Sequence, residues 1–322
     1  MKKRILLILA LIFCYALFSQ QENPKIGLVL SGGGAKGFAH VGVLKEIDRA
    51  GIKLDYIGGT SMGAIIAGLY AVGYTGDQIE QLIKKIDFPK ILSDRLPRST
   101  SPFFEKEYGE KTKVTLPTNG KKIDFPEAVS KGQSVLNIFY ELLGEYAYFH
   151  DFSKLSTPFY CVATNAETGK SFVFEEGPLA LALRASGSFP TLLSPIKYED
   201  KLLVDGGISN NFPVQIMKDK GIDIVIGVDV QGKLLKKENI NSVVDILNQT
   251  VNYEMYGKTA REKEKVDVYI HPNIYDFDVV DFGEKDTILK IGTHEAKRYS
   301  AIFKDLAKKQ KKVYKKEKFT TS

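Results

Sequence analysis

The stretch Gly59-Thr60-Ser61-Met62-Gly63 has the form G-x-S-x-G and lies between an apolar run that ends at Ile57 and a run of small residues, 64–70. This pattern is typical of a sharp turn from a strand into a helix, where the flanking Gly59 and Gly63 tolerate the tight backbone. The positive N-terminal end of such a helix favours negative charge that develops near the serine. The stretch therefore predicts that Ser61 is a nucleophile, although the pentapeptide alone also fits an ordinary turn.

A glycine-rich loop precedes this turn. Within residues 31–37, SGGGAKG, Gly32, Gly34 and Gly37 fit the pattern G-x-G-x-x-G between a predicted strand and a predicted helix. A dinucleotide site with this pattern needs an acidic residue at the end of the second strand. Asp55 has about the right separation but stands at the start of that strand, which disfavours a dinucleotide.

Such a loop has another chemical use. Successive glycine N–H groups at a helix N-terminus can hold an alkoxide with no side chain in the way. We therefore predict that Gly32, Gly33 and Gly34 form an oxyanion hole beside the serine.

A serine nucleophile also needs a base. The order Ser61, Asp205, His271 would suit the triad of an α/β-hydrolase, but too few strands precede Ser61 for that fold. The four candidate bases of the usual type are His40, His150, His271 and His294. We expect His40 to pack or cap and His271 to have a polar structural role.

Asp205 is the stronger candidate for the base. It ends a short strand predicted over 201–204, and Gly206 and Gly207 after it let backbone or substrate approach closely. A carboxylate can accept a serine proton directly if desolvation raises its pKa. The same three residues also fit a simple turn. Asn211, before Phe212-Pro213, is predicted to cap a helix over 212–219.

Hydrophobic periodicity predicts a single α/β domain. A strand–helix–strand–helix order over 25–86 favours a mainly parallel sheet with helices on its faces. Further strands are predicted at 54–57, 159–163 and 223–230, and one long helix closes the domain over 287–309.

Residues 1–20 form a basic start followed by an apolar run that is short for a membrane span. They are typical of a cleaved signal peptide, with a retained anchor as the alternative. We therefore expect an exported protein that is periplasmic, outer-membrane-associated or secreted. Only Cys161 remains after cleavage, so no internal disulfide is expected.

The formal charge of +6 comes from the two ends of the chain. Residues 306–322 form a basic tail, and the segment from Lys304 to Lys318 carries eight lysines. The body between is nearly neutral. The tail is either a solvated chain end or a segment attracted to anionic lipid headgroups. With no basic stripe elsewhere, nothing indicates nucleic acid.

Taken together, Gly32–Gly37, Gly59–Gly63 and Asp205–Gly207 resemble the motifs of the patatin-like phospholipase family, in particular its secreted bacterial type. The likeness extends into GFAHVGVL at 37–44 and into residues 182–195, and covers roughly residues 24–305, the predicted catalytic domain. It implies a three-layer α/β/α sandwich.

The resemblance also implies a function. The serine of the family's G-x-S-x-G motif corresponds to Ser61 and is the nucleophile, the aspartate corresponds to Asp205 and is the sole base, and Gly32–Gly34 are the oxyanion hole. The implied activity is hydrolysis of acyl esters in phospholipids and other lipids at a peripheral membrane surface, without a metal or other cofactor. An acyltransferase with the same dyad and a non-enzymatic lipid-binding module are the alternatives.

Overall fold

The computed structural model describes residues 23–94, 118–119, 122–123, 128–234, 236–240, 243–310 and 314–320. The predicted signal, residues 1–20, lies outside this range. In the part of the chain that is described, no helix is both long and apolar enough to cross a bilayer.

A central sheet organises the chain, with strand order β12-β11-β1-β2-β6-β10-β9 and β7 beside β6. The first five of these strands are parallel to one another, whereas β10, β9 and β7 are antiparallel to their neighbours. The prediction of a mainly parallel sheet is confirmed. The strands of this sheet are β1 (Ile26–Leu30), β2 (Tyr56–Thr60), β6 (Phe159–Asn165), β7 (Ser171–Phe174), β9 (Ile196–Tyr198), β10 (Lys201–Asp205), β11 (Ile224–Val228) and β12 (Val268–Ile270).

Two shorter pairings lie outside the sheet. β3 (Thr118–Asn119) pairs with β4 (Lys122–Ile123) in an antiparallel ladder. β5 (Ala128–Ser130) pairs in parallel with β8 (Thr191–Leu193).

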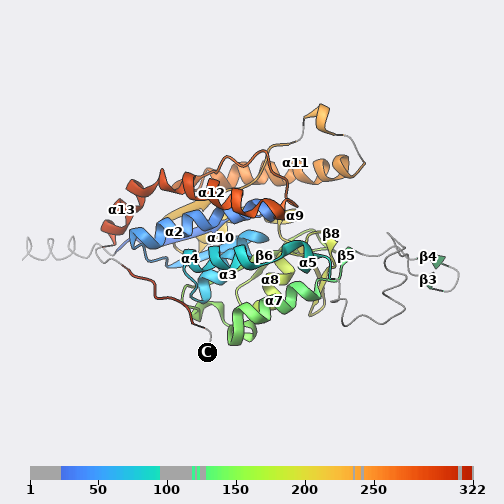
Figure 1. The fold of residues 1–322 in the computed structure, drawn as a ribbon, viewed down its shortest axis with the longest axis horizontal. Coiled ribbons are helices and arrows are strands. Elements are labelled where there is room, and N and C mark those ends of the chain that lie inside the picture. Colours follow the sequence, from blue (N-terminus) through green and yellow to red (C-terminus); the bar gives the residue numbers. More distant parts are fainter. Residues whose placement is uncertain are drawn as a thin grey trace, which may run out of the picture.

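Helices cover both faces of the sheet and complete the predicted three layers (Figure 1). The α-helices are α2 (His40–Ala50), α3 (Met62–Val72), α4 (Gly76–Lys85), α5 (Phe88–Leu92), α7 (Gln133–Leu143), α8 (Leu179–Ser186), α9 (Gly207–Asn210), α10 (Val214–Asp219), α11 (Val243–Lys263), α12 (Lys285–Lys297) and α13 (Ser300–Lys309). The 3₁₀ turns are η1 (Gly34–Ala39), η2 (Gly144–Tyr148), η3 (Phe152–Lys154), η4 (Lys237–Asn239) and η5 (Phe282–Glu284).

The two faces of the sheet have cores of different size. On one face, Leu28, Ile57 and Cys161 are fully buried in a large cluster with side chains of α2, α3, α8, α12 and α13. On the other, Val29 and Tyr160 pack in a smaller cluster against Phe212 and α10. Alternate residues of β1 thus point to opposite layers, as expected of a strand buried on both sides.

Two predicted elements differ from the structure. The single helix over 287–309 is wrong, because the chain breaks at Tyr299, whose hydroxyl donates to the backbone of Tyr269 at 3.1 Å. The strand predicted over 54–57 instead runs from Tyr56 to Thr60 and includes two glycines. A Cβ on Gly58 would lie 2.3 Å from the Tyr160 ring, so close packing requires glycine inside this strand.

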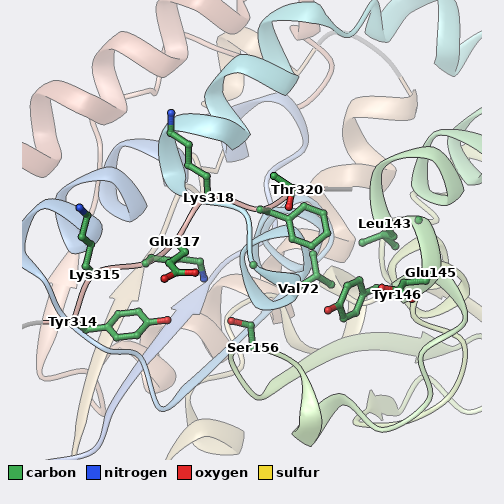
Figure 2. A pocket seen from close by; sticks show the side chains of 14 residues that line it. Val72, Leu143, Glu145, Tyr146, Ser156, Tyr314, Lys315, Glu317, Lys318 and Thr320 are labelled. Atoms are coloured by element: carbon green, nitrogen blue, oxygen red, sulfur yellow. The ribbon is translucent and has the colours of Figure 1, made fainter. Parts of the chain in front are cut away.

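The last described part of the basic tail, 314–320, is docked on the body of the protein. The Tyr314 N–H donates to Gly51 O at 2.9 Å, and the Phe319 ring lies 4.4 Å from that of Tyr74. Figure 2 shows this segment along one wall of a cleft of about 560 Å³, with Val72 and Tyr146 on the opposite side.

Lys316 anchors this segment. Its ammonium donates to Tyr70 O at 2.8 Å and lies 3.4 Å from the centre of the Tyr70 ring. Burial lowers the pKa of Lys316 to about 8. Lys316 is therefore unlike the exposed lysines around it, such as Lys315 and Lys318, whose side chains face solvent.

α2 and α12 meet through glycine backbones. A Cβ on Gly42 would lie 2.3 Å from the carbonyl carbon of Gly292. Because backbone cannot move aside as a side chain can, we predict that Gly42→Ala lowers the free energy of unfolding by about 1–3 kcal/mol in urea titrations.

The matched control is Gly257→Ala in α11, where a Cβ meets no atom within 4 Å. That change should raise stability by about 0.5–1 kcal/mol through helix propensity. Equal effects of the two substitutions would contradict a backbone contact at Gly42.

Candidate active site

Ser61 occupies a strained turn between β2 and α3. Its φ of 54° and ψ of −126° are unusual for a residue with a side chain, and such conformations persist only where the surroundings impose them. The Ser61 N–H donates to Ser186 Oγ at 2.9 Å, and that hydroxyl donates in turn to Val162 O at 2.6 Å. The turn is thus held from the neighbouring strand and from α8.

The glycines on either side of Ser61 allow this turn to sit against the end of β1. A Cβ on Gly59 would lie 2.5 Å from Leu30 O, and one on Gly63 would lie 2.4 Å from the same atom. Both positions therefore exclude a side chain, in agreement with the sequence pattern.

Asp205 ends β10, which is separated by β6 from β2, the strand that leads into Ser61, yet the two side chains are hydrogen-bonded. Ser61 Oγ donates to Asp205 Oδ2 at 2.6 Å, although 144 residues separate the two in the sequence. β10 is antiparallel to β6, and its last residue pairs with Ala163, while Thr60 of β2 pairs with Val162. The serine and the aspartate therefore lie at the same level on either side of β6.

The Asp205 carboxylate is enclosed. The residue is only 3% exposed, and its Oδ1 accepts a hydrogen bond from Gly207 N at 2.7 Å. Burial raises the pKa of Asp205 to about 6, against the smaller lowering effect of the hydrogen bonds from Ser61 and Gly207. A Cβ on Gly206 would lie 2.1 Å from Val162 O, so this glycine lets β10 close onto β6.

The glycine-rich loop lies directly beside the serine. A Cβ on Gly32 would lie 3.2 Å from Ser61 Cβ. The Gly32 N–H itself donates to Asn211 O at 3.1 Å, and Asn211 Nδ2 donates to Gly32 O at 3.2 Å. Among the described residues, the N–H groups of Gly33 and Gly34 have no acceptor, whereas that of Ala35 donates to Val279 O. The backbone N–H groups of Gly33 and Gly34 are therefore the donors of this loop that remain free, in the part of the chain described, to bind a substrate oxygen.

Two of the four candidate histidines, His40 and His271, make side-chain hydrogen bonds away from Ser61 and Asp205. His40 Nε2 lies 2.8 Å from Ser31 O, and complete burial lowers the pKa of His40 to about 4. His271 Nε2 lies 2.7 Å from the hydroxyl of Tyr275. Within the described part of the chain, no histidine is hydrogen-bonded to Ser61 or Asp205.

Asp55, the acidic residue weighed for a dinucleotide site, bonds at the far end of the sheet. Its Oδ2 accepts the N–H of Ile26 at 2.8 Å, at the start of β1, whereas the glycine loop follows the end of β1. In the described residues, no cluster of three or more histidine, cysteine, aspartate or glutamate side chains could hold a metal ion.

Three supporting residues were not found from the sequence. Asn211, predicted as a helix cap, instead joins the glycine loop, and Pro213 stands at the cap position of α10. Ser186 holds the serine turn. Arg184, almost fully buried, donates to Ser188 Oγ at 2.6 Å, and the Ser188 carbonyl accepts the N–H of Asp205.

Comparisons with known proteins give the family and the fold that this chain resembles. The family model described as patatin-like phospholipase matches residues 28–218. A lysophospholipase NTE1 of Candida albicans is 29% identical over 312 residues, covering 89% of this chain and 21% of its own. An uncharacterized NTE family protein of Mycobacterium tuberculosis is also 29% identical, with 88% and 47% covered. The chain thus spans less than half the length of either relative.

A solved structure shows the same fold. The crystal structure of VipD from Legionella pneumophila aligns with a TM-score of 0.50 at 17% identity, over 87% of this chain and 67% of VipD.

The buried carboxyl gives a test that does not depend on activity. Asp205 holds its proton in the folded protein up to about pH 6 but loses it near 3.8 when unfolded, so its contribution to stability falls as pH rises through that window. We predict that Asp205→Asn gains on the order of 2–3 kcal/mol relative to wild type between pH 4 and pH 7.5 in urea titrations. An unchanged difference at the two pH values would contradict the raised pKa.

Proposed function

We propose that this chain, which belongs to the patatin-like phospholipase family, hydrolyses acyl esters of lipids with Ser61 as nucleophile and Asp205 as the only base. The observation that carries this proposal is the 2.6 Å hydrogen bond from Ser61 Oγ to the enclosed Asp205 carboxylate. No histidine among the described residues shares that contact.

In the proposed first step, Ser61 Oγ attacks the ester carbonyl while its proton passes to Asp205 Oδ2. The carbonyl oxygen becomes an oxyanion that accepts hydrogen bonds from the N–H groups of Gly33 and Gly34, which are free of other acceptors among the described residues. The intermediate then collapses, Asp205 returns the proton to the leaving alcohol, and an acyl ester remains on Ser61. Water attacks this ester by the same proton transfers and releases the fatty acid.

The electrostatics of the site suit these roles. A general base works best when its pKa is near the working pH, and burial brings the pKa of Asp205 to about 6. The N-terminal end of α3 begins at Met62, so its positive dipole end faces the reacting atoms. Gly32 contributes the shape of the loop rather than a donor, because its N–H is already bonded to Asn211.

The substrate class follows from the family. The Candida albicans relative is named a lysophospholipase, and we propose that phospholipids or lysophospholipids are the substrates here as well. We also propose that residues 1–20 direct export and that the protein acts at a membrane surface outside the inner membrane.

Activity on a soluble ester such as p-nitrophenyl butyrate tests the dyad. We predict that Ser61→Ala and Asp205→Asn each reduce kcat/KM by at least about 10³-fold, because nucleophile and base act as one unit. In wild type, kcat/KM should fall as pH drops below about 6, where Asp205 becomes protonated.

The controls are His40→Ala, His271→Ala and His294→Ala. Each should keep activity within about tenfold of wild type once shown to be folded, because no bond links these histidines to the dyad. If one of these histidine variants is folded but as inactive as Asp205→Asn, the dyad is wrong and that histidine belongs to a triad.

We also propose that the basic tail draws the enzyme to anionic bilayers. Lys316 is unsuitable for charge reversal because it holds the tail to α3. We predict that reversing four exposed lysines weakens co-sedimentation with anionic vesicles about tenfold or more. The four changes are Lys304→Glu, two residues before the tail, and Lys308→Glu, Lys315→Glu and Lys318→Glu within it.

A control with the same change in net charge uses exposed lysines outside the tail. These are Lys85, Lys90, Lys170 and Lys197. If both quadruple variants lose vesicle binding equally, net charge rather than the tail is responsible. Turnover of the soluble ester should stay near wild type in the tail variant.

A further inference from the structure

A second hollow lies at the carboxyl ends of β11 and β12, apart from Ser61 and Asp205. It has a volume of about 340 Å³. Its lining comes from the segment after β11, from the last turns of α11 and from the end of β12. The lining residues used below are Asp229, Gln231, Tyr256, Thr259, Lys263 and His271.

Several polar atoms in this lining are buried without a partner. Gln231 is 5% exposed, and among the described residues neither its Nε2 nor its Oε1 has a hydrogen-bond partner. Thr259 is 6% exposed, and among the described residues its Oγ1 also has no hydrogen-bond partner. His271 Nδ1 makes no hydrogen bond there either but lies 3.9 Å from Asp229 Oδ2. Buried polar groups are almost always satisfied in native proteins, so the Gln231 amide and the Thr259 hydroxyl are available to hydrogen-bond a molecule bound in this hollow.

The unpartnered atoms define the ligand's hydrogen bonding. The Gln231 amide offers both a donor and an acceptor, and a threonine hydroxyl can act as either. Hydroxyl groups on a ligand have the same double capacity. The Asp229 carboxylate does not need a hydrogen bond from the ligand. Its oxygens already accept the N–H of Gln231 at 2.9 Å and the hydroxyl of Tyr269 at 2.8 Å.

The charged side chains beside the hollow indicate the charge of the ligand. Lys263 lines the hollow, and Lys36 Nζ lies 3.0 Å from the position a Cβ would take on Gly232, another lining residue. A quaternary ammonium would need open aromatic faces. However, Lys263 Nζ lies 4.1 Å from the Tyr269 ring and Lys233 Nζ lies 4.4 Å from the Tyr275 ring. Among the described residues, Asp229 is the one carboxylate in the lining, and Lys36 and Lys263 outnumber it, so an anionic group suits the edge of the hollow better than a cation does.

We propose that the hollow binds a small polyol phosphate, with Gln231 and Thr259 bonding its hydroxyls and the lysines at its border facing its phosphate. Such a group can be the headgroup of a lipid or a free metabolite. The hollow adjoins the glycine-rich loop, since the Val230 N–H donates to Ser31 Oγ and Val230 Cγ2 lies 2.7 Å from the Cβ position of Gly33. If the ligand is a lipid headgroup, the proposal rests on the lipid hydrolase function proposed above; if it is a free metabolite, it does not.

The decisive variant is Thr259→Val, which removes the unpartnered hydroxyl with little change of shape. Without ligand it should melt at the same temperature as wild type or slightly above, because an unsatisfied buried group has been replaced by an apolar one. Its affinity for sn-glycerol 3-phosphate in calorimetry should fall at least about tenfold. Thr250→Val is the control on the same helix, since that hydroxyl is exposed and bonded to Ile246 O; it should bind like wild type.

Gln231→Leu provides a second, independent variant with the same expected pattern. The proposal is overturned if wild type does not bind sn-glycerol 3-phosphate and Thr259→Val keeps the wild-type preference for phosphatidylglycerol over phosphatidylcholine vesicles. It is also overturned if both variants lose melting temperature and affinity together, because the two residues would then be structural.

One further measurement, the ratio of turnover on a phospholipid to turnover on a soluble ester, separates the lipid headgroup from the free metabolite. If the headgroup occupies the hollow, Thr259→Val should lower the ratio of turnover on phosphatidylglycerol to turnover on p-nitrophenyl butyrate. If a free metabolite occupies it, that ratio stays constant while binding of sn-glycerol 3-phosphate weakens. Calorimetry with sn-glycerol 3-phosphate needs no hydrolysis, so it tests the hollow even if the proposed esterase activity is absent.

Discussion

The register of β6 against its two neighbours is the constraint on which the site depends. Thr60 pairs with Val162 from one side, and Asp205 pairs with Ala163 from the other. Only this alignment places the serine hydroxyl 2.6 Å from the carboxylate. A slip of one residue would turn Asp205 to the opposite face of the sheet, because side chains alternate along a strand.

Close backbone contacts enforce that register. Gly206 brings β10 against Val162 O, while Gly59 and Gly63 bring the serine turn against Leu30 O. The same contacts exclude water from Asp205, and this exclusion raises its pKa. Tight packing and the basicity of the carboxylate are thus two results of one arrangement, and the stability lost by burying a charge is a condition of the proposed chemistry.

The sequence predicted the parts of the structure that depend on local patterns. Gly59–Gly63 and Gly206-Gly207 mark positions where backbone passes close to backbone. The predictions for Ser61 and Asp205 were made from these glycines. Ser186, Asn211 and Arg184 escaped prediction because their roles come from contacts between distant segments, such as Asn211 with Gly32.

Other differences have the same origin. Gly58 and Gly59 have low strand propensity, yet they continue β2 because neighbouring atoms leave no room for a side chain. Nothing in the lysine-rich composition of the tail distinguishes Lys316 from Lys315, and only the position of Tyr70 makes the first a buried anchor. Composition therefore describes the tail's charge but not its attachment.

The long separation between Ser61 and Asp205 also has a consequence for the order of folding. Contacts between residues far apart in sequence carry a high loop-closure cost and delay folding, and this pair spans 144 residues. The strained backbone of Ser61 is held by Ser186 and Val162, which are themselves more than 100 positions away. Ser61 can therefore reach its final conformation only after Ser186 and β10 have taken their places, so the proposed chemistry depends on contacts that span more than 100 residues.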